Sequence, residues 1–260
     1  MSDLDAIQQS AQAQFDRQSD RYGRSHILAD VRDVEAALAR LPATANRRAL
    51  DVATGAGHTG LCLARHGWQV TLADISPAML DKAAGAARGA GLHVETRQHT
   101  AEAMPYPDAS FDLVTCRVAA HHFSSPEKFV RETARVLAPG GAFILIDGSV
   151  ADNEPVAEEW IHRVEKLRDP SHQRFGTPGT WTRLCEMAGL RVIHAALEPM
   201  KQPDLNWYLE VAGTLPEARA QIVELVRTAP AEARALFRIA DEAGAIMWWW
   251  QRLTLIATKS

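Results

Sequence analysis

The chain has 260 residues, which is enough for one large α/β domain with a substantial buried core. Its 28 basic and 32 acidic residues give a net charge of −4 with no run of lysine or arginine, which argues against a nucleic-acid partner and favours a small-molecule substrate. The three cysteines are scattered and form no C-x-x-C pair, so the sequence indicates neither a disulfide framework nor a thiolate zinc site, and we expect a reducing, cytoplasmic location.

The first 46 residues precede any predicted strand. They begin with a polar segment that lacks the basic start and apolar core of a signal peptide, and no apolar run in the chain approaches the length that spans a membrane. Residues 5–22 predict a surface helix. Apolar residues spaced by three and four predict an amphipathic helix over 26–41 that packs on the sheet and ends at Pro42. We therefore expect residues 1–46 to form N-terminal lid and packing helices.

Strands and helices alternate between residues 47 and 149. Short, β-rich apolar runs of this kind are typical of strands buried on both faces, and their alternation with helices predicts a parallel sheet with right-handed crossovers. The strands are predicted at residues 49–53, 69–73, 92–98, 111–116 and 142–147, and the helices at 61–65, after Ser76-Pro77, and at 126–137. This part of the chain is the predicted cofactor-binding core.

The pattern changes after residue 149. Here the sequence predicts helices at 151–169 and 178–189, a strand at 191–197, a helical region at 203–240, and a long last strand at 247–259 beside 191–197. We interpret the three tryptophans Trp248, Trp249 and Trp250 as core residues rather than a ligand platform. No motif in 203–246 is interpretable; that region either shapes an acceptor site or forms a homodimer contact. We group 150–260 as substrate-side insertions and terminal strands of one domain, 1–260.

The first strand leads into a glycine turn, and residues 50–60 read L-D-V-A-T-G-A-G-H-T-G. Gly55 and Gly57 can adopt positive φ and let a ligand lie against the backbone, while the following helix presents unpaired N–H groups. The pattern G-x-G-x-x-G is weak evidence alone, because a ligand-free turn has the same composition. A nucleotide-like cofactor is the first hypothesis.

Two aspartates flank this turn. Asp74, nineteen residues after Gly55, ends the second strand, where a carboxylate can accept hydrogen bonds from a ribose diol; the alternative is a helix N-cap. Asp51 precedes the glycines, where an anion would repel a pyrophosphate. A carboxylate suits a ligand that carries an ammonium and no phosphate, either by direct contact or by holding the loop. The pair therefore favours the methionine-bearing nucleoside S-adenosylmethionine over a nicotinamide cofactor.

Four ordered motifs carry a family resemblance over about residues 47–149. They are A-L-D-V-A-T-G-A-G-H, V-T-L-A-D-I-S-P-A-M-L, T-A-E-A-M-P-Y-P-D-A-S-F-D-L-V-T-C-R and A-R-V-L-A-P-G-G-A-F-I-L-I-D. With them the chain resembles class I S-adenosylmethionine-dependent methyltransferases of the type 11, ubiquinone/menaquinone methyltransferase-like family. The resemblance implies a Rossmann-like α/β fold: a seven-stranded, mostly parallel sheet in the order 3-2-1-4-5-7-6, with the last strand antiparallel and helices on both faces.

The resemblance also implies a cofactor site. Carried over by position, the resemblance places Asp51, Ala53, Gly55 and Gly57 along the methionine and ribose part of the cofactor, and Asp74 at the ribose hydroxyls. It places Ile75, Met79, Thr100, Ala101 and Glu102 around the adenine, and Arg117 close to the methionine end. Tyr22 resembles the lid tyrosine of relatives. Thr100 departs from the family, which usually has an acidic residue there, so we expect a weaker adenine contact at this position.

The implied reaction is in-line displacement at a sulfonium methyl group, for which the protein holds the reactants in line and excludes water. A base is needed only for a protonated nucleophile, and His121 and His122, just after the fourth strand, are the candidates. The alternative is that the pair only lines the cofactor pocket. No third ligand at suitable spacing supports a metal site.

Residues 167–175 form a second polar concentration. If this loop folds over the carboxyl edge of the sheet, it offers Arg168, Asp169, His172 and Arg174 to the substrate. The alternative is a solvated loop in which Arg and Asp pair with each other.

The sequence leaves two other functions open. One is an NAD(P)-dependent oxidoreductase, which Asp51 and the absence of a Tyr-x-x-x-Lys constellation disfavour. The other is a non-catalytic protein that binds S-adenosylmethionine. Methyl transfer to a small organic acceptor is the function that we expect, and the acceptor and the methylated atom stay open at this point.

Overall fold

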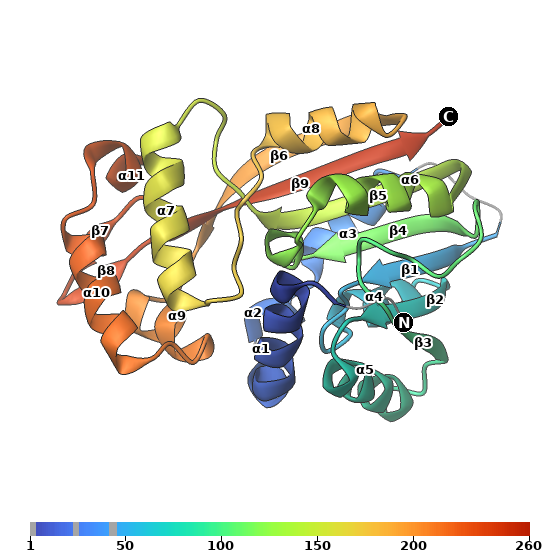
Figure 1. The fold of residues 1–260 in the computed structure, drawn as a ribbon, viewed down its shortest axis with the longest axis horizontal. Coiled ribbons are helices and arrows are strands. Elements are labelled where there is room, and N and C mark those ends of the chain that lie inside the picture. Colours follow the sequence, from blue (N-terminus) through green and yellow to red (C-terminus); the bar gives the residue numbers. More distant parts are fainter. Residues whose placement is uncertain (1–3, 23–25, 42–45) are drawn as a thin grey trace.

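A computed structural model describes residues 4–22, 26–41 and 46–260 of the chain. Its centre is a seven-stranded sheet in the order β3-β2-β1-β4-β5-β9-β6 (Figure 1). The strands are β1 Arg48–Val52, β2 Gln69–Asp74, β3 Val94–Gln98, β4 Phe111–Arg117, β5 Leu137–Gly148, β6 Leu190–Lys201 and β9 Trp249–Lys259. β9 pairs antiparallel with both β5 and β6, and the pairs among β1 to β5 are parallel. The predicted order and the antiparallel last strand are confirmed.

Helices cover both faces of the sheet. They are α3 Arg32–Leu38, α4 His58–Arg65 and α5 Pro77–Gly89 on one face, and α6 Pro126–Val136 and α8 Pro178–Met187 on the other. Successive residues of β5 point to opposite faces, so Phe143 packs with Phe129 of α6 while Ile144 belongs to the core with Val34 of α3. This two-sided burial explains why the strand is a continuous apolar run.

Helix starts follow signals that are legible in the sequence. The N-cap residues of α5, α6 and α8 are Ser76, Ser125 and Thr177, and each side-chain oxygen accepts a hydrogen bond from a backbone N–H in the first turn. A proline follows each cap at the first helical position, where its missing N–H costs nothing. These caps fix where the helices leave the sheet.

The N-terminal region departs from prediction in one respect. Helix α1 Ala6–Tyr22 is present, but the single helix expected over 26–41 is two helices, α2 His26–Ala29 and α3, separated by Asp30 and Val31. The Asp30 carboxylate accepts hydrogen bonds from the backbone N–H and the guanidinium of Arg32. These bonds stabilise a turn at Asp30, so the helix does not continue through it. Pro42, the predicted helix end, lies outside the described residues.

A lobe built from the C-terminal half stands at one end of the sheet (Figure 1). It contains α7 Pro155–Arg168, α9 Leu205–Val211, α10 Pro216–Arg227, α11 Ala231–Leu236 and the hairpin β7 Ala240–Glu242 and β8 Ala245–Met247. Its own apolar cluster includes Trp160, Tyr208, Phe237 and Trp248. β9 runs from this lobe across the sheet, so the region without an interpretable motif is packed beside the strand ends. Whether 1–260 behaves as one domain stays a prediction.

None of the helices in the described part of the chain is both long and apolar enough to cross a membrane.

Candidate functional site

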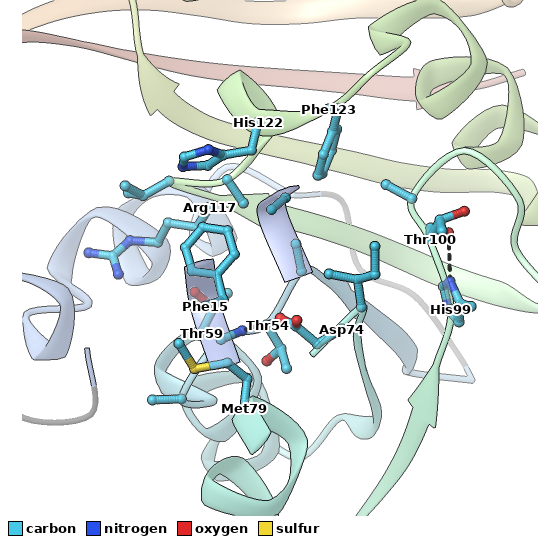
Figure 2. A pocket seen from close by; sticks show the side chains of 18 of the residues that line it. Phe15, Thr54, Thr59, Asp74, Met79, His99, Thr100, Arg117, His122 and Phe123 are labelled. Atoms are coloured by element: carbon cyan, nitrogen blue, oxygen red, sulfur yellow. Dashed lines mark hydrogen bonds between the residues drawn. The ribbon is translucent and has the colours of Figure 1, made fainter. Parts of the chain in front are cut away.

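A cavity lies at the carboxyl ends of β1, β2 and β4 (Figure 2). Residues from the glycine turn, the end of β2, the segment 99–102, the segment 117–123 and α1 form its wall. The predicted site residues on this wall are Ala53, Gly55, Asp74, Ile75, Met79, Thr100, Ala101, Glu102, Arg117 and His122. The fold therefore brings together residues that are far apart in the chain.

Four predicted site residues lie elsewhere, and one cannot be placed. Asp51 and Gly57 lie behind the turn rather than on the wall, and His121 and His172 line a neighbouring cavity described below. The side chain of Tyr22 falls outside the described residues.

The glycine turn uses positive φ as predicted. Gly55 has φ +54° and Gly57 φ +89°, and Ala53 just before them has φ +52°. A Cβ added to Gly55 would meet no atom within 4 Å, so this residue faces open space. A Cβ added to Gly57 would lie 2.9 Å from the Ala83 Cβ in α5. Gly55 thus leaves room for a ligand, whereas Gly57 allows α5 to approach the turn.

Gly57→Ala is expected to lower the free energy of unfolding by about 2 kcal/mol, because the new methyl group clashes with α5 and the positive φ becomes strained. Gly89→Ala is the control: Gly89 ends α5 with free space around its Cα and no positive φ, so alanine there should be neutral or stabilising by about 0.5 kcal/mol. Urea unfolding compares the two variants, and equal midpoints would contradict this assignment.

Asp74 is a carboxylate on the cavity wall that is only 6% exposed. It accepts hydrogen bonds from the backbone N–H of Gly55 at 2.8 Å and of Ser76 at 2.9 Å. Burial raises the pKa of Asp74 to about 6, and these two hydrogen bonds oppose the shift. Asp74 therefore stabilises the glycine turn and also presents a hydrogen-bond acceptor to the cavity.

Asp51 lies beneath the turn and is 1% exposed. Its carboxylate accepts from the Thr54 hydroxyl at 2.5 Å, the Gly60 backbone N–H at 3.0 Å and the Thr115 hydroxyl at 2.7 Å. Burial raises the pKa of Asp51 to about 6 despite these bonds. Of the two roles considered for Asp51, this geometry supports holding the loop.

Hydrogen bonds of two side chains, Glu102 and His99, connect the segments of the opposite wall. The Glu102 carboxylate accepts from the backbone N–H of Ser124 at 2.9 Å and from the Gln8 amide of α1 at 3.0 Å. His99 Nδ1 donates to the Thr100 carbonyl at 2.8 Å, and His99 Nε2 lies within hydrogen-bond distance of the Tyr106 hydroxyl at 3.0 Å. His99 was missed at the sequence level; its position directly after β3, at a strand end, was the available signal.

A second cavity adjoins the first. The two share the wall residues Phe15, Leu28, Arg117, Val118 and His122. The second cavity extends from there to the end of β5, to α7 and α9, and to the start of β9. The two cavities are therefore adjacent and have part of their walls in common.

His121 belongs to this second cavity. It lies in the short 3₁₀ helix Ala120–His122, and Asp147 at the end of β5 accepts from its ring Nδ1 at 2.7 Å and its backbone N–H at 3.0 Å. Burial lowers the pKa of His121, but the charge and hydrogen bond of Asp147 outweigh burial and the net shift is upward. Asp147 was also missed, although it is the last letter of the motif A-F-I-L-I-D.

The other histidines are buried neighbours of this pair. The ring centroid of His121 lies 4.2 Å from that of His122 and 5.3 Å from that of His172. Burial lowers the pKa of His122 and of His172, and the positive charge of protonated His121 adds to both shifts. Within the described ranges no three His, Cys, Asp or Glu side chains are placed to hold a metal ion.

The loop 167–175 packs against the carboxyl edge of the sheet, and within it only Pro170 and Arg174 are exposed. Asp169 is 2% exposed and accepts from Ser171, whose hydroxyl lies 3.1 Å from His122 Nδ1. In the alternative of a solvated loop, an Arg and an Asp would pair with each other, but Arg168 pairs with Glu165 of α7 at 2.9 Å. Arg174 pairs with Glu158 away from both cavities, so its proposed role toward the substrate is not supported.

Two of the three tryptophans, Trp248 and Trp250, belong to the buried apolar cluster of the lobe. Trp248 is fully buried in the lobe, as predicted. Trp250 lines the second cavity, with its ring centroid 5.4 Å from that of Phe175 and 6.0 Å from that of Tyr208. Trp250 also belongs to the buried apolar cluster of the lobe, at 8% exposure, so its interpretation as a core residue is confirmed, and it additionally borders the second cavity.

Comparison with known proteins gives one consistent family. The sequence model of the methyltransferase domain matches residues 50–145, from β1 into β5. The chain is 33% identical over 227 residues to the protein named uncharacterized methyltransferase YcgJ of Bacillus subtilis, covering 86% of this chain and 88% of YcgJ. The crystal structure of YcgJ has a TM-score of 0.80 at 31% identity, covering 90% of this chain and 99% of that one.

A demethylmenaquinone methyltransferase of Thermus thermophilus is 39% identical over 118 residues, which are 45% of this chain and 52% of that enzyme. This shorter match is limited to about half of each protein. The sheet order, the glycine turn and the long match to YcgJ together identify the family to which the chain belongs. It belongs to the methyltransferases that carry the domain matched at residues 50–145, and it has their seven-stranded fold.

Proposed function

We propose that this methyltransferase binds S-adenosylmethionine in the first cavity and transfers its methyl group to a small organic acceptor. The observation that carries the proposal is the Asp74 carboxylate on the cavity wall, beside the open face of Gly55. When bound, S-adenosylmethionine supplies a methyl group on a sulfonium sulfur that leaves as a neutral thioether. The residues around it need only bind, orient and exclude water.

The wall residues fit a nucleoside. Asp74 is placed to accept from a ribose diol, and Met79 lies on the same wall (Figure 2). With Ile75, which follows Asp74 in the chain, Met79 offers an apolar surface for the base. Thr100 and Ala101 lie on the far side, where the backbone and the threonine hydroxyl offer polar contacts. We assign the adenine to this apolar slot and the methionine end to the side of Arg117.

The charge distribution supports a cationic ligand over a pyrophosphate. Arg117 is the one arginine or lysine among the described wall residues, and it already binds Asp33 at 3.0 Å and the Leu28 carbonyl at 2.9 Å. Asp51 and Asp74 place two carboxyl groups at the turn. A nicotinamide dinucleotide would bring its pyrophosphate against them without a compensating cation.

Helix α1 is positioned to shield the site. Phe15 points into the cavity with its ring centroid 4.9 Å from that of His122, in an edge-to-face contact (Figure 2). Gln8 bonds Glu102 across the cavity, and Gln12 donates to the Ile75 carbonyl at 3.1 Å. The helix must separate from these contacts to admit a ligand and re-form them to exclude water.

Binding of S-adenosylhomocysteine, compared with NADH and NADPH, tests the proposal. A ligand at a hundred times its Kd stabilises the fold by about 2.7 kcal/mol, so S-adenosylhomocysteine should raise the melting temperature and the nicotinamides should not. A shift with a nicotinamide and none with S-adenosylhomocysteine would end the proposal.

Asp74→Asn should weaken S-adenosylhomocysteine binding by about tenfold, because an amide cannot accept from Gly55, Ser76 and a ribose diol together. In the wild type, affinity should fall as the pH is lowered through about 6, since the raised pKa of Asp74 means that its carboxylate is protonated there. Asp81→Asn, an exposed acid on α5, is the control. Isothermal calorimetry from pH 5 to 8 measures both effects, and a flat profile with unchanged Asn affinity would refute this role.

We also propose a cytoplasmic location. The three cysteines, Cys62, Cys116 and Cys185, are buried free thiols, which is typical of proteins kept in a reducing compartment.

A further inference from the structure

We propose that the second cavity is the acceptor site, that it takes an uncharged hydroxylated aromatic compound, and that His121, held by Asp147, accepts the hydroxyl proton. This inference rests on the proposed function, because it assumes that the methyl donor occupies the first cavity. It assigns a substrate class and a catalytic residue that the family match alone does not specify.

The two cavities are placed for transfer between them. Phe15, Arg117, Val118 and His122 form part of both walls, so a group at the boundary contacts the contents of either cavity. Val118 has φ +52°, which turns the chain sharply between β4 and the histidine pair. The methyl acceptor atom therefore belongs at this boundary, with the rest of the acceptor in the second cavity.

Aromatic and sulfur-bearing side chains line the body of the second cavity. Trp207 and Tyr208 come from α9, Trp250 from β9 and Met200 from β6. The rings of Tyr208 and Trp250 meet edge to face, with their centroids 6.0 Å apart. Such a wall suits a planar apolar ring system.

The charged side chains of this cavity already neutralise one another. Arg117 and Arg252 both bind Asp33, at 3.0 and 3.1 Å, and Arg168 binds Glu165 at 2.9 Å. Among the described wall residues, no arginine or lysine is without a carboxylate partner. An acceptor with a carboxylate or phosphate would have to break one of these pairs, so the cavity favours an uncharged acceptor.

The His121–Asp147 pair supplies the polar chemistry. Asp147 accepts from Nδ1, which fixes the ring and its tautomer and leaves Nε2 as the basic nitrogen of the neutral imidazole. No described residue forms a hydrogen bond with Nε2. His121 lines the cavity, so this nitrogen is available to a hydroxyl group bound beside Trp250, whose ring centroid lies 6.4 Å from that of His121.

The step balances without a further reactant. The acceptor O–H bond breaks and its proton moves to His121 Nε2. The oxygen lone pair forms the new bond to the methyl carbon, and the electron pair of the sulfur–carbon bond stays on sulfur. His121 then releases the proton to solvent, and the products are an aryl methyl ether and S-adenosylhomocysteine.

Several ionisable groups set the proton affinity of His121. Asp147, Glu165 and Asp169 raise its pKa, from β5, α7 and the loop after α7, whereas burial lowers it. His122 and His172 also face it and stay neutral, because burial lowers the pKa of both. The rate should therefore rise with pH through the raised pKa of His121 and level off above it.

A set of matched acceptors tests the substrate class in the full-length protein. S-adenosylhomocysteine release is measured with 1-naphthol, 1-naphthylamine and 1-naphthoate, which share one ring system and differ in the reacting group. We expect methylation of 1-naphthol at oxygen, at least tenfold faster than of the amine and with none of the carboxylate. Preferred methylation of the amine or of the carboxylate would overturn the proposal, and so would no turnover of 1-naphthol by protein that binds S-adenosylhomocysteine.

Two variants test the roles of the pair. His121→Gln and Asp147→Asn should each lower kcat for 1-naphthol by about 10²- to 10⁴-fold with S-adenosylhomocysteine affinity within about twofold. In Asp147→Asn the amide donates to Nδ1, which places the proton on Nε2 and removes the base. His93→Gln, an exposed histidine before β3, should leave the rate unchanged.

An acidic acceptor separates proton transfer from a structural role. 4-Nitro-1-naphthol is ionised before it binds, so its KM should be high in both proteins, because the cavity disfavours an anion. Its kcat should nevertheless agree within about threefold between wild type and Asp147→Asn, because no proton remains to be removed. An equal loss with both naphthols would show that Asp147 acts only structurally and would overturn the assignment of the base. Failure of S-adenosylhomocysteine to bind the wild type would instead refute the proposed function.

Discussion

Asp51→Ala is expected to lower the free energy of unfolding by about 3 kcal/mol and to weaken S-adenosylhomocysteine binding by more than about tenfold. The substitution removes the acceptor of three hydrogen bonds beneath the glycine turn, from Thr54, Gly60 and Thr115. Each buried donor left without a partner costs about 1–3 kcal/mol, and the loss of the buried carboxylate offsets part of that sum. Urea unfolding and calorimetric titration measure the two effects.

Asp51→Asn is the matched variant, because an amide of the same shape keeps the oxygen for Gly60 and can donate to Thr115. In the wild type, burial raises the pKa of Asp51 from its ordinary value of 3.8 to about 6, so the stability that the protonated form contributes is lost as the pH rises between these values. Above pH 6 the Asn variant should therefore be as stable as the wild type or more stable.

The same variant should bind S-adenosylmethionine about tenfold more weakly at pH 8, because a negative charge near the cationic ligand is gone. Wild-type affinity in both Asp51→Asn and Asp51→Ala would contradict the role of Asp51 in distinguishing a sulfonium nucleoside from a dinucleotide phosphate.

Arg117→Met is expected to destabilise the fold by about 3–5 kcal/mol. The Arg117 side chain is 7% exposed, and it joins Asp33 of α3 to the carbonyls of Leu28 and Asp30. Methionine fills the space but leaves the two carbonyls without this donor and leaves Asp33, 3% exposed, with Arg252 as its remaining arginine. The break between α2 and α3 depends on these bonds, so the common wall of the two cavities should loosen.

Arg131→Met on α6 provides the comparison. Its guanidinium is 59% exposed and pairs with Glu127 on the surface, so the cost should be below about 1 kcal/mol. Equal urea midpoints for the two methionine variants would mean that the buried network around Asp33 does not stabilise the protein.

The sheet was predictable because its strands have a simple physical signature. β5 is apolar at successive residues since both of its faces are covered, and the caps at Ser76, Ser125 and Thr177 mark where helices begin. The break at Asp30 was not predictable from periodicity. The apolar spacing continues through it, and the group that stabilises it, Arg117, comes from β4.

The first cavity was largely predictable for a related reason. Ligands of open parallel sheets bind at the carboxyl ends of strands, and the turn at Gly55 and the carboxylate Asp74 mark two adjacent ends in the sequence. Gly57 was misplaced because a glycine required by helix packing and one required by a ligand have the same letter. The structure distinguishes the two kinds of glycine, because a Cβ on Gly57 would lie 2.9 Å from the Ala83 Cβ, whereas one on Gly55 would meet no atom within 4 Å.

The sequence by itself determined the strands, the helix starts and most of the wall of the first cavity, because these depend on local signals: apolar runs, caps, the glycine turn and carboxylates at strand ends. Its four motifs gave the family and, by resemblance, the order of the strands. Only the tertiary structure decided the second cavity, which we propose as the acceptor site. His121, Asp147 and Trp250 come from three elements that meet because β9 inserts antiparallel between β5 and β6 and carries the lobe back to the strand ends. Contacts between residues so distant in the chain depend on the packing of the whole fold, so no local sequence pattern predicts them.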